Sequence, residues 1–76
     1  MRQVELYTTH TWTYCLRVKE FLSEKNVDYV EYNVQDDMAA RRRMVEISRH
    51  TTVPTIVVGD EVIVGFDAKR LDQLLQ

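Results

Sequence analysis

The chain has 76 residues, of which 45% are hydrophobic and 29% are charged, and its formal net charge is −2. This length allows one small domain, predicted to span residues 1–76, and the composition is that of an ordinary soluble globular protein. A net charge of −2 gives no indication of a nucleic-acid partner or of a membrane partner. No apolar run approaches the ~20 residues that a membrane-spanning helix needs.

The cysteine content and the first residues indicate where the protein works. A single cysteine, Cys15, excludes a fold held together by disulfides. Arg2 and Glu5 lie in an N-terminal segment without a signal-peptide pattern, so we expect a cytoplasmic protein. The basic cluster at residues 41–43 falls in a segment with a helical pattern, which favours a solvated helix face over a partner contact.

Strand and helix patterns alternate in the first half of the chain. Residues 4–9 alternate and are rich in β-forming side chains, which predicts a strand. Residues 13–25 have apolar side chains at helical spacing, and Asn26 is a suitable C-terminal stop. Residues 27–34 alternate again and predict a second strand.

The next segment predicts a second helix. Asp36 or Asp37 can cap it, and it runs to about Arg49. At helical spacing, four residues fall near one line along the helix surface, namely Met38, Arg41, Val45 and Ser48. Met44 and Ile47 lie beside that line.

A hairpin and a last helix complete the pattern. Residues 55–58 and 61–64 predict two short strands joined by the two-residue turn Gly59-Asp60. Asp67 can cap a final helix, whose apolar residues are Leu71, Leu74 and Leu75 with Ala68 at the same spacing. The order β-α-β-α-β-β-α, with a parallel first βαβ unit, predicts an α/β thioredoxin fold in which three helices flank a four-stranded mixed sheet.

The loop between the first strand and the first helix is where a reactive thiol is expected. The N-terminus of a helix stabilises a thiolate, and a second cysteine three residues further on can close a disulfide. The sequence there is Trp12-Thr13-Tyr14-Cys15, which has the second position of such a pair without the first. A lone cysteine on an apolar face is otherwise most often a small buried hydrophobic residue.

Three segments resemble the glutaredoxin family. Residues 6–9 and 11–19 are similar to its active-site segment, in which a Tyr-Thr strand end leads into Cys-Pro-Tyr-Cys. Residues 51–54 match its Thr-Val-Pro turn, and residues 64–67 resemble the Gly-Phe turn of glutaredoxin-like redoxins of the NrdH kind. The resemblance covers the whole chain and implies a thiol–disulfide oxidoreductase.

The resemblance assigns roles to two residues of the loop. Trp12 aligns with the nucleophilic cysteine and Cys15 with the resolving cysteine. An indole cannot form a mixed disulfide, so we expect the chain to be inactive or impaired. The tryptophan codon lies one base from both cysteine codons and from UGA, which specifies selenocysteine. We therefore interpret Trp12 as replacing a cysteine or selenocysteine through engineering or misdecoding; the alternatives are an aromatic residue packed on the loop or a binding residue.

The resemblance also implies a groove for glutathione or for a disulfide-bearing protein. Its residues by that resemblance are Tyr14, His50, Thr52, Val53, Pro54, Gly65, Phe66 and Asp67. The Val53–Pro54 bond is cis in the family, although most X–Pro bonds are trans. The charged clamps for glutathione are reduced to His50 and Arg49, so we expect weak binding, and Asp67 is explained equally well as a helix cap.

No bound cofactor or metal is expected. His10, His50 and Cys15 lie on separate elements without the spacing of a zinc site, and a glutaredoxin-type iron–sulfur cluster would use the missing cysteine. The electron donor would be glutathione or a thioredoxin-reductase-like flavoenzyme. The main alternative is a non-enzymatic thioredoxin-fold module that binds peptides. A piece of a larger glutathione-transferase-like protein is disfavoured, because residues 74–76 close the last helix.

Overall fold

The strand β1 (Val4–Thr8) lies inside a four-stranded sheet with the order β2-β1-β3-β4. The structure is a computed structural model, and it describes residues 3–9 and 13–75. β1 pairs in parallel with β2 (Val30–Asn33) and antiparallel with β3 (Thr55–Val58), which pairs antiparallel with β4 (Glu61–Val64). This mixed sheet confirms the predicted fold class.

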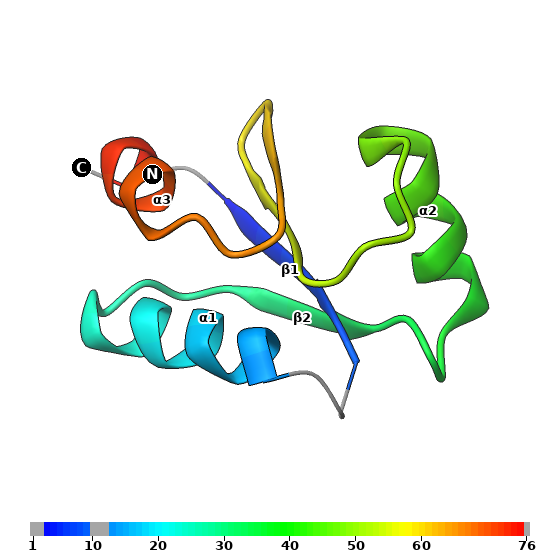
Figure 1. Cartoon of the computed structure of the whole chain (residues 1–76), viewed down its shortest axis with the longest axis horizontal. Helices are drawn as coiled ribbons and strands as arrows, with labels where there is room; N and C mark the ends of the chain where they lie inside the picture. Colours follow the sequence, from blue (N-terminus) through cyan, green and yellow to red (C-terminus); the bar gives the residue numbers. More distant parts are fainter. Residues whose placement is uncertain (1–2, 10–12, 76) are drawn as a thin grey trace.

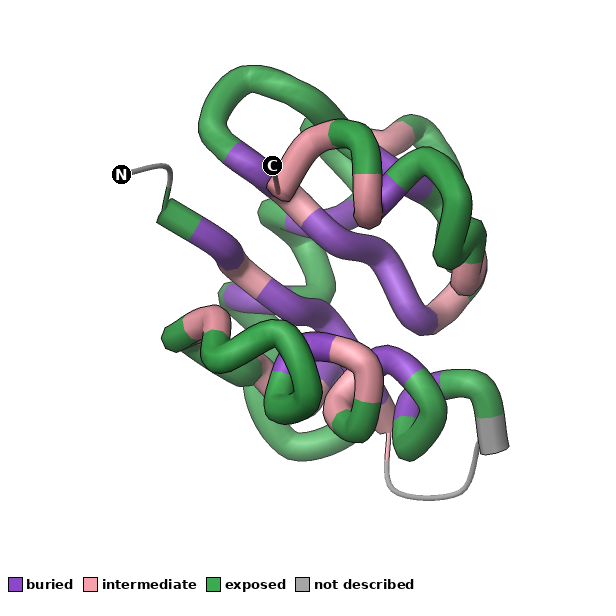
Figure 2. The backbone as a smooth tube through the Cα atoms, turned by 90° about the vertical axis from the view of Figure 1, so that its left-hand side faces the viewer, coloured by how far each residue is buried: buried purple, intermediate pink, exposed green. Residues whose placement is uncertain are grey.

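The helices lie on both sides of the sheet. α1 (Thr13–Glu24) and α3 (Ala68–Leu74) are on one side and α2 (Met38–Ser48) is on the other (Figure 1). The core on the side of α1 and α3 comprises Val4, Leu6, Val18, Leu22, Ile56, Val58, Ile63 and Leu71. A smaller core beneath α2 comprises Tyr7, Val34, Ala40 and Met44. In Figure 2 the buried positions accordingly concentrate on the strands and on the inner sides of the helices.

β2 is shorter than the sequence pattern predicted, because the end of α1 uses the first residues of the expected strand. Asn26 adopts a left-handed conformation with φ of 57°. The N–H of Asn26 donates to the Ser23 carbonyl at 3.1 Å, and the N–H of Val27 donates to the Leu22 carbonyl at 3.0 Å. This pair of bonds is a Schellman motif, and Val27 packs against the core that contains Leu22. Residues 27–29 therefore belong to the connection rather than to the sheet.

α2 faces the sheet with a different side from the one that its apolar residues suggested. Asp37 caps the helix by accepting a hydrogen bond from the Ala40 N–H at 3.0 Å, as predicted. Ala40 and Met44 are the buried residues of the helix. Met38, Val45 and Ile47 are exposed, so the line of residues that the helical spacing singled out is not the buried side of the helix. The short Ala40 side chain allows the helix to approach the sheet along this side, where Met44 joins the core around Tyr7.

The C-terminal part of the chain agrees with its prediction. The two strands of the hairpin have the predicted bounds, and Gly59 has a φ of 60°, which a two-residue hairpin turn favours. Asp67 caps α3 through its carboxylate, which accepts from the Arg70 N–H at 3.1 Å. Leu71 is buried, whereas Ala68 is exposed and takes no part in the core. Among the described residues no helix is long and apolar enough to span a membrane.

The two methionines of α2 test its orientation. Met44 is 1% exposed and Met38 is 63% exposed. Met44→Ala should lower the free energy of unfolding by about 2–5 kcal/mol, because it leaves a cavity beneath the helix. Met38→Ala should change it by less than about 0.5 kcal/mol. Urea denaturation followed by circular dichroism measures both, and equal losses in the two variants would contradict this orientation.

Candidate functional site

Cys15 lies at the start of α1 but is directed into the protein. It is the third residue of the helix and only 1% exposed. Burial raises the pKa of the Cys15 thiol above its usual value, and a hydrogen bond from the Thr9 backbone acts in the opposite direction but is outweighed. The thiol is therefore predominantly protonated at neutral pH and has little nucleophilic character. Trp12, the residue expected at the position of the nucleophile, lies outside the described residues.

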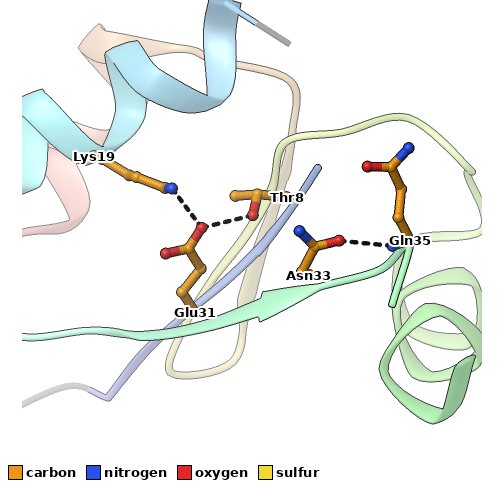
Figure 3. Close-up of polar contacts among 5 residues, drawn as sticks. All are labelled: Thr8, Lys19, Glu31, Asn33 and Gln35. Atoms are coloured by element: carbon orange, nitrogen blue, oxygen red, sulfur yellow. Dashed lines mark hydrogen bonds and ion pairs between the residues drawn. The ribbon is translucent and has the colours of Figure 1, made fainter. Parts of the chain in front are cut away.

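A polar network lies close to this thiol. The Lys19 Nζ is 2.6 Å from the Glu31 Oε2, and the Thr8 hydroxyl donates a hydrogen bond to the same oxygen at 2.8 Å (Figure 3). The Lys19 charge lowers the pKa of Cys15 and the Glu31 charge raises it, although both effects are smaller than that of burial. The network thus places two opposite charges within electrostatic reach of the thiol.

The sequence analysis did not single out this network. Its one local signal is that Lys19 follows Cys15 by four positions, which places the two side chains on the same face of α1. Glu31 reaches the network from β2 and Thr8 from β1, and only the folded sheet brings these two strands together.

The segment 52–54 forms a backbone edge suited to binding an extended chain. The Val53–Pro54 peptide bond is cis, as the family resemblance implied, and Pro54 is fully buried. The Thr52 carbonyl accepts a hydrogen bond from the Thr55 hydroxyl at 2.8 Å. Within ranges 3–9 and 13–75, the N–H and C=O of Val53 make no hydrogen bond to another residue. Unpaired backbone groups of this kind can add a peptide strand.

The Gly-Phe turn is joined directly to that edge. The Gly65 N–H donates to the Pro54 carbonyl at 2.8 Å, and Gly65 has a φ of 84°, which side-chain-bearing residues rarely adopt. The Phe66 ring packs edge-on against Phe21 with centroids 6.0 Å apart. The fold therefore brings together two of the predicted site segments, whereas Asp67 has the confirmed role of capping α3.

Two other predicted site residues lie on the surface. Tyr14 is 54% exposed, and the Arg17 guanidinium lies 5.8 Å from the centre of its ring. His50 is also exposed, and its backbone N–H donates to the Ser48 hydroxyl at 3.1 Å. In the part of the chain that the structure describes, no three His, Cys, Asp or Glu side chains are close enough to hold a metal ion.

Comparison with known proteins agrees with this geometry. The family model described as Glutaredoxin matches residues 4–63. The chain belongs to the glutaredoxin family. Members of the glutaredoxin family are thiol–disulfide oxidoreductases that act on disulfide proteins or glutathione, so a function of this type is supported for this chain.

Individual relatives cover nearly all of the chain. A protein of Clostridium pasteurianum, an uncharacterized glutaredoxin-like 8.6 kDa protein in the rubredoxin operon, is 38% identical over 73 residues, which are 96% of this chain and 97% of that protein. Glutaredoxin 3 of Escherichia coli K12 is 40% identical over 67 residues, 88% of this chain and 81% of the relative. The crystal structure of the thioredoxin-like protein BC3987 superposes with a TM-score of 0.91 and 40% identity, covering 95% of this chain and 99% of that one.

The raised pKa of the Cys15 thiol predicts how stability depends on pH. The unfolded thiol has its ordinary pKa of about 9.0, while the folded thiol keeps its proton to higher pH. The folded state therefore binds more protons above this value, and the stability contributed by the neutral thiol is lost as the pH rises. The difference in unfolding free energy between the unsubstituted chain and Cys15→Ala should be constant below about pH 8 and should shrink above about pH 9. Urea denaturation at pH 7–10.5 tests this, and a constant difference would contradict it.

Proposed function

We propose that this chain has a glutaredoxin-type thiol–disulfide site that is disabled at its first step. The observation that carries the proposal is the state of Cys15, which is the only cysteine, is 1% exposed and has a raised pKa. Such a thiol is a poor attacking group, because attack requires an accessible thiolate. The residue at the helix entrance, Trp12, has no sulfur to replace it.

The position of Cys15 fits the second step of disulfide reduction. In the first step a thiolate attacks one sulfur of the substrate disulfide, forms a mixed disulfide and releases one substrate thiolate. In the second step a neighbouring thiolate attacks the sulfur of the first cysteine and releases the other substrate thiolate. Two electrons pass to the substrate, and the protein retains a disulfide. A buried thiol three residues after the first cysteine is suited to this second, intramolecular attack.

The backbone edge at Val53 supports a substrate with an extended peptide chain. Its unpaired N–H and C=O can pair with the backbone around the cysteine of a protein disulfide or of glutathione. The reaction needs no resident cofactor, because thiols carry the electrons. The donor would be glutathione or a thioredoxin-reductase-like flavoenzyme, in a reducing compartment such as the cytoplasm.

Restoring the missing thiol tests the proposal. The unsubstituted chain, with Trp12, should reduce insulin disulfides no faster than the dithiothreitol background. Trp12→Cys should form one intramolecular disulfide with Cys15 and should reduce insulin faster by on the order of a hundredfold or more, because it supplies the nucleophile. Reverse-phase separation and mass spectrometry detect the disulfide, and the turbidity assay measures the rate.

Two matched variants complete this test. Trp12→Ser controls for removal of the indole, and Trp12→Cys with Cys15→Ser provides a nucleophile without a resolving thiol. If Trp12→Cys folds but neither forms the disulfide nor reduces a substrate, the loop is not a disabled redox site. The function would then be the second candidate, a peptide-binding module that uses the Val53 edge.

We further propose that position 12, now Trp12, was originally occupied by a cysteine or a selenocysteine. The rest of the predicted site supports this, because the resolving position, the cis Val53–Pro54 bond and the Gly65 turn are all present. Reading UGA as tryptophan would produce this chain. Sequencing the natural gene decides the question: UGA at codon 12 supports misdecoding, whereas UGG removes that explanation and favours the binding module.

Glutathione should bind this chain weakly. The Val53 edge is available, but the charged groups near it are the exposed Arg49 and His50. We expect a dissociation constant in the millimolar range, equivalent to about −4 kcal/mol. Arg49→Gln should weaken binding, and Arg42→Gln, at an exposed position of α2, serves as the matched control. Calorimetric titration at neutral pH measures the affinity; a low-micromolar value would show that the site has clamps other than these.

A further inference from the structure

The Lys19–Glu31 ion pair is fixed in place by three elements of the fold. Lys19 projects from α1 one turn after Cys15, Glu31 comes from β2, and Thr8 comes from the end of β1. The Glu31 Oε2 receives both the Lys19 ammonium, at 2.6 Å, and the Thr8 hydroxyl, at 2.8 Å (Figure 3). Because Thr8 is 1% exposed, its hydroxyl is a rigid anchor for the carboxylate.

The pair is only partly shielded from water. The Lys19 and Glu31 side chains are 31% and 34% exposed, respectively, while Cys15, one helical turn before Lys19 on α1, is 1% exposed. An exposed ion pair of this kind adds little to stability by itself. Its position within reach of a buried thiol gives it a different use, because a charge acts strongly on a neighbouring group that has lost most of its solvent.

We propose that Lys19 and Glu31 are positioning residues for Cys15, and that their ion pair controls how readily the buried thiol gives up its proton. Lys19 favours the thiolate, and Glu31 opposes it while also holding Lys19 in place. The inference rests on the proposed function in one respect, since a resolving thiol must ionise before it attacks. The electrostatic control itself does not depend on Trp12 or on turnover.

The directions of the effects follow from the charges that face Cys15. Among residues 3–9 and 13–75, these are Lys19 on α1 and Glu31 on β2, together with the backbone hydrogen bond from Thr9. Glu31→Gln removes the opposing charge and releases Lys19, so the thiol should ionise at lower pH. Lys19→Gln removes the favourable charge and releases Glu31, so the thiol should ionise at higher pH. A change that merely loosened the packing would hydrate Cys15 and shift both variants towards lower pH.

The single cysteine makes this measurable in the chain as it exists. With ¹³C-labelled cysteine, the Cβ chemical shift reports the ionisation of Cys15 alone. A charge at this depth should change the thiolate fraction about twofold to fivefold, which is a midpoint shift of about 0.3 to 0.7 pH units in each direction. Lys19→Arg keeps the charge and should restore the natural midpoint. Glu20→Gln, an exposed carboxylate of the same helix, should leave it unchanged.

The outcome separates this inference from the proposed function. Opposite shifts in Glu31→Gln and Lys19→Gln, with Lys19→Arg close to the natural chain, support it even if Trp12→Cys has no reductase activity. Shifts in the same direction, or unchanged midpoints in both variants, overturn it even if Trp12→Cys is active. Molar salt should reduce the two shifts, because the pair is partly exposed.

Discussion

Burial of β1 on both of its faces is the constraint on which the rest of the structure depends. Alternate side chains of a strand point to opposite faces, so Val4 and Leu6 enter the core beneath α1 and α3 while Tyr7 enters the core beneath α2. Tyr7 also stacks on Tyr32 of the neighbouring strand, with ring centroids 5.2 Å apart. A strand in this position must be covered by helices on both sides and paired along both edges. The parallel β2 and the antiparallel β3 meet that requirement.

The environment of Cys15 is a consequence of how α1 covers this strand. Val18 and Leu22 hold the helix on the sheet, and the same face of the helix carries Cys15 into the interior. The start of a helix favours a thiolate by an amount on the order of 1 kcal/mol. For Cys15 burial has the larger effect and keeps the thiol protonated. A reaction with a disulfide would therefore have to begin at a second thiol that is more exposed than Cys15.

Under the proposed function, residue 12 is the side chain that decides activity, because the other expected features of the site are present in this chain. The cis Val53–Pro54 edge, the Gly65 turn bonded to it and the resolving position at Cys15 are features of a glutaredoxin-family member. None of them supplies a nucleophile. Fold and family membership are thus compatible with an active reductase, and only the proposed function assigns a loss of activity to residue 12.

Much of this protein could be read from local patterns. The cis Val53–Pro54 bond was implied by the family resemblance and not by the local sequence, since most X–Pro bonds are trans. Residue periodicity, by contrast, determined the order of the strands and helices, and the acidic caps at Asp37 and Asp67 determined where two helices begin. These features depend on residues that are close together in the sequence, so the sequence by itself was sufficient for them.

Other features required contacts between distant segments. The side of α2 that is buried was decided by the fit of Ala40 and Met44 over Tyr7, although exposed apolar residues on the helix suggested another side. The length of β2 was decided by the Schellman motif at the end of α1. The network around Glu31 joins residues from β1, α1 and β2, and no spacing along the chain reveals it. Packing and charge depend on positions in space, so only the tertiary structure could decide them.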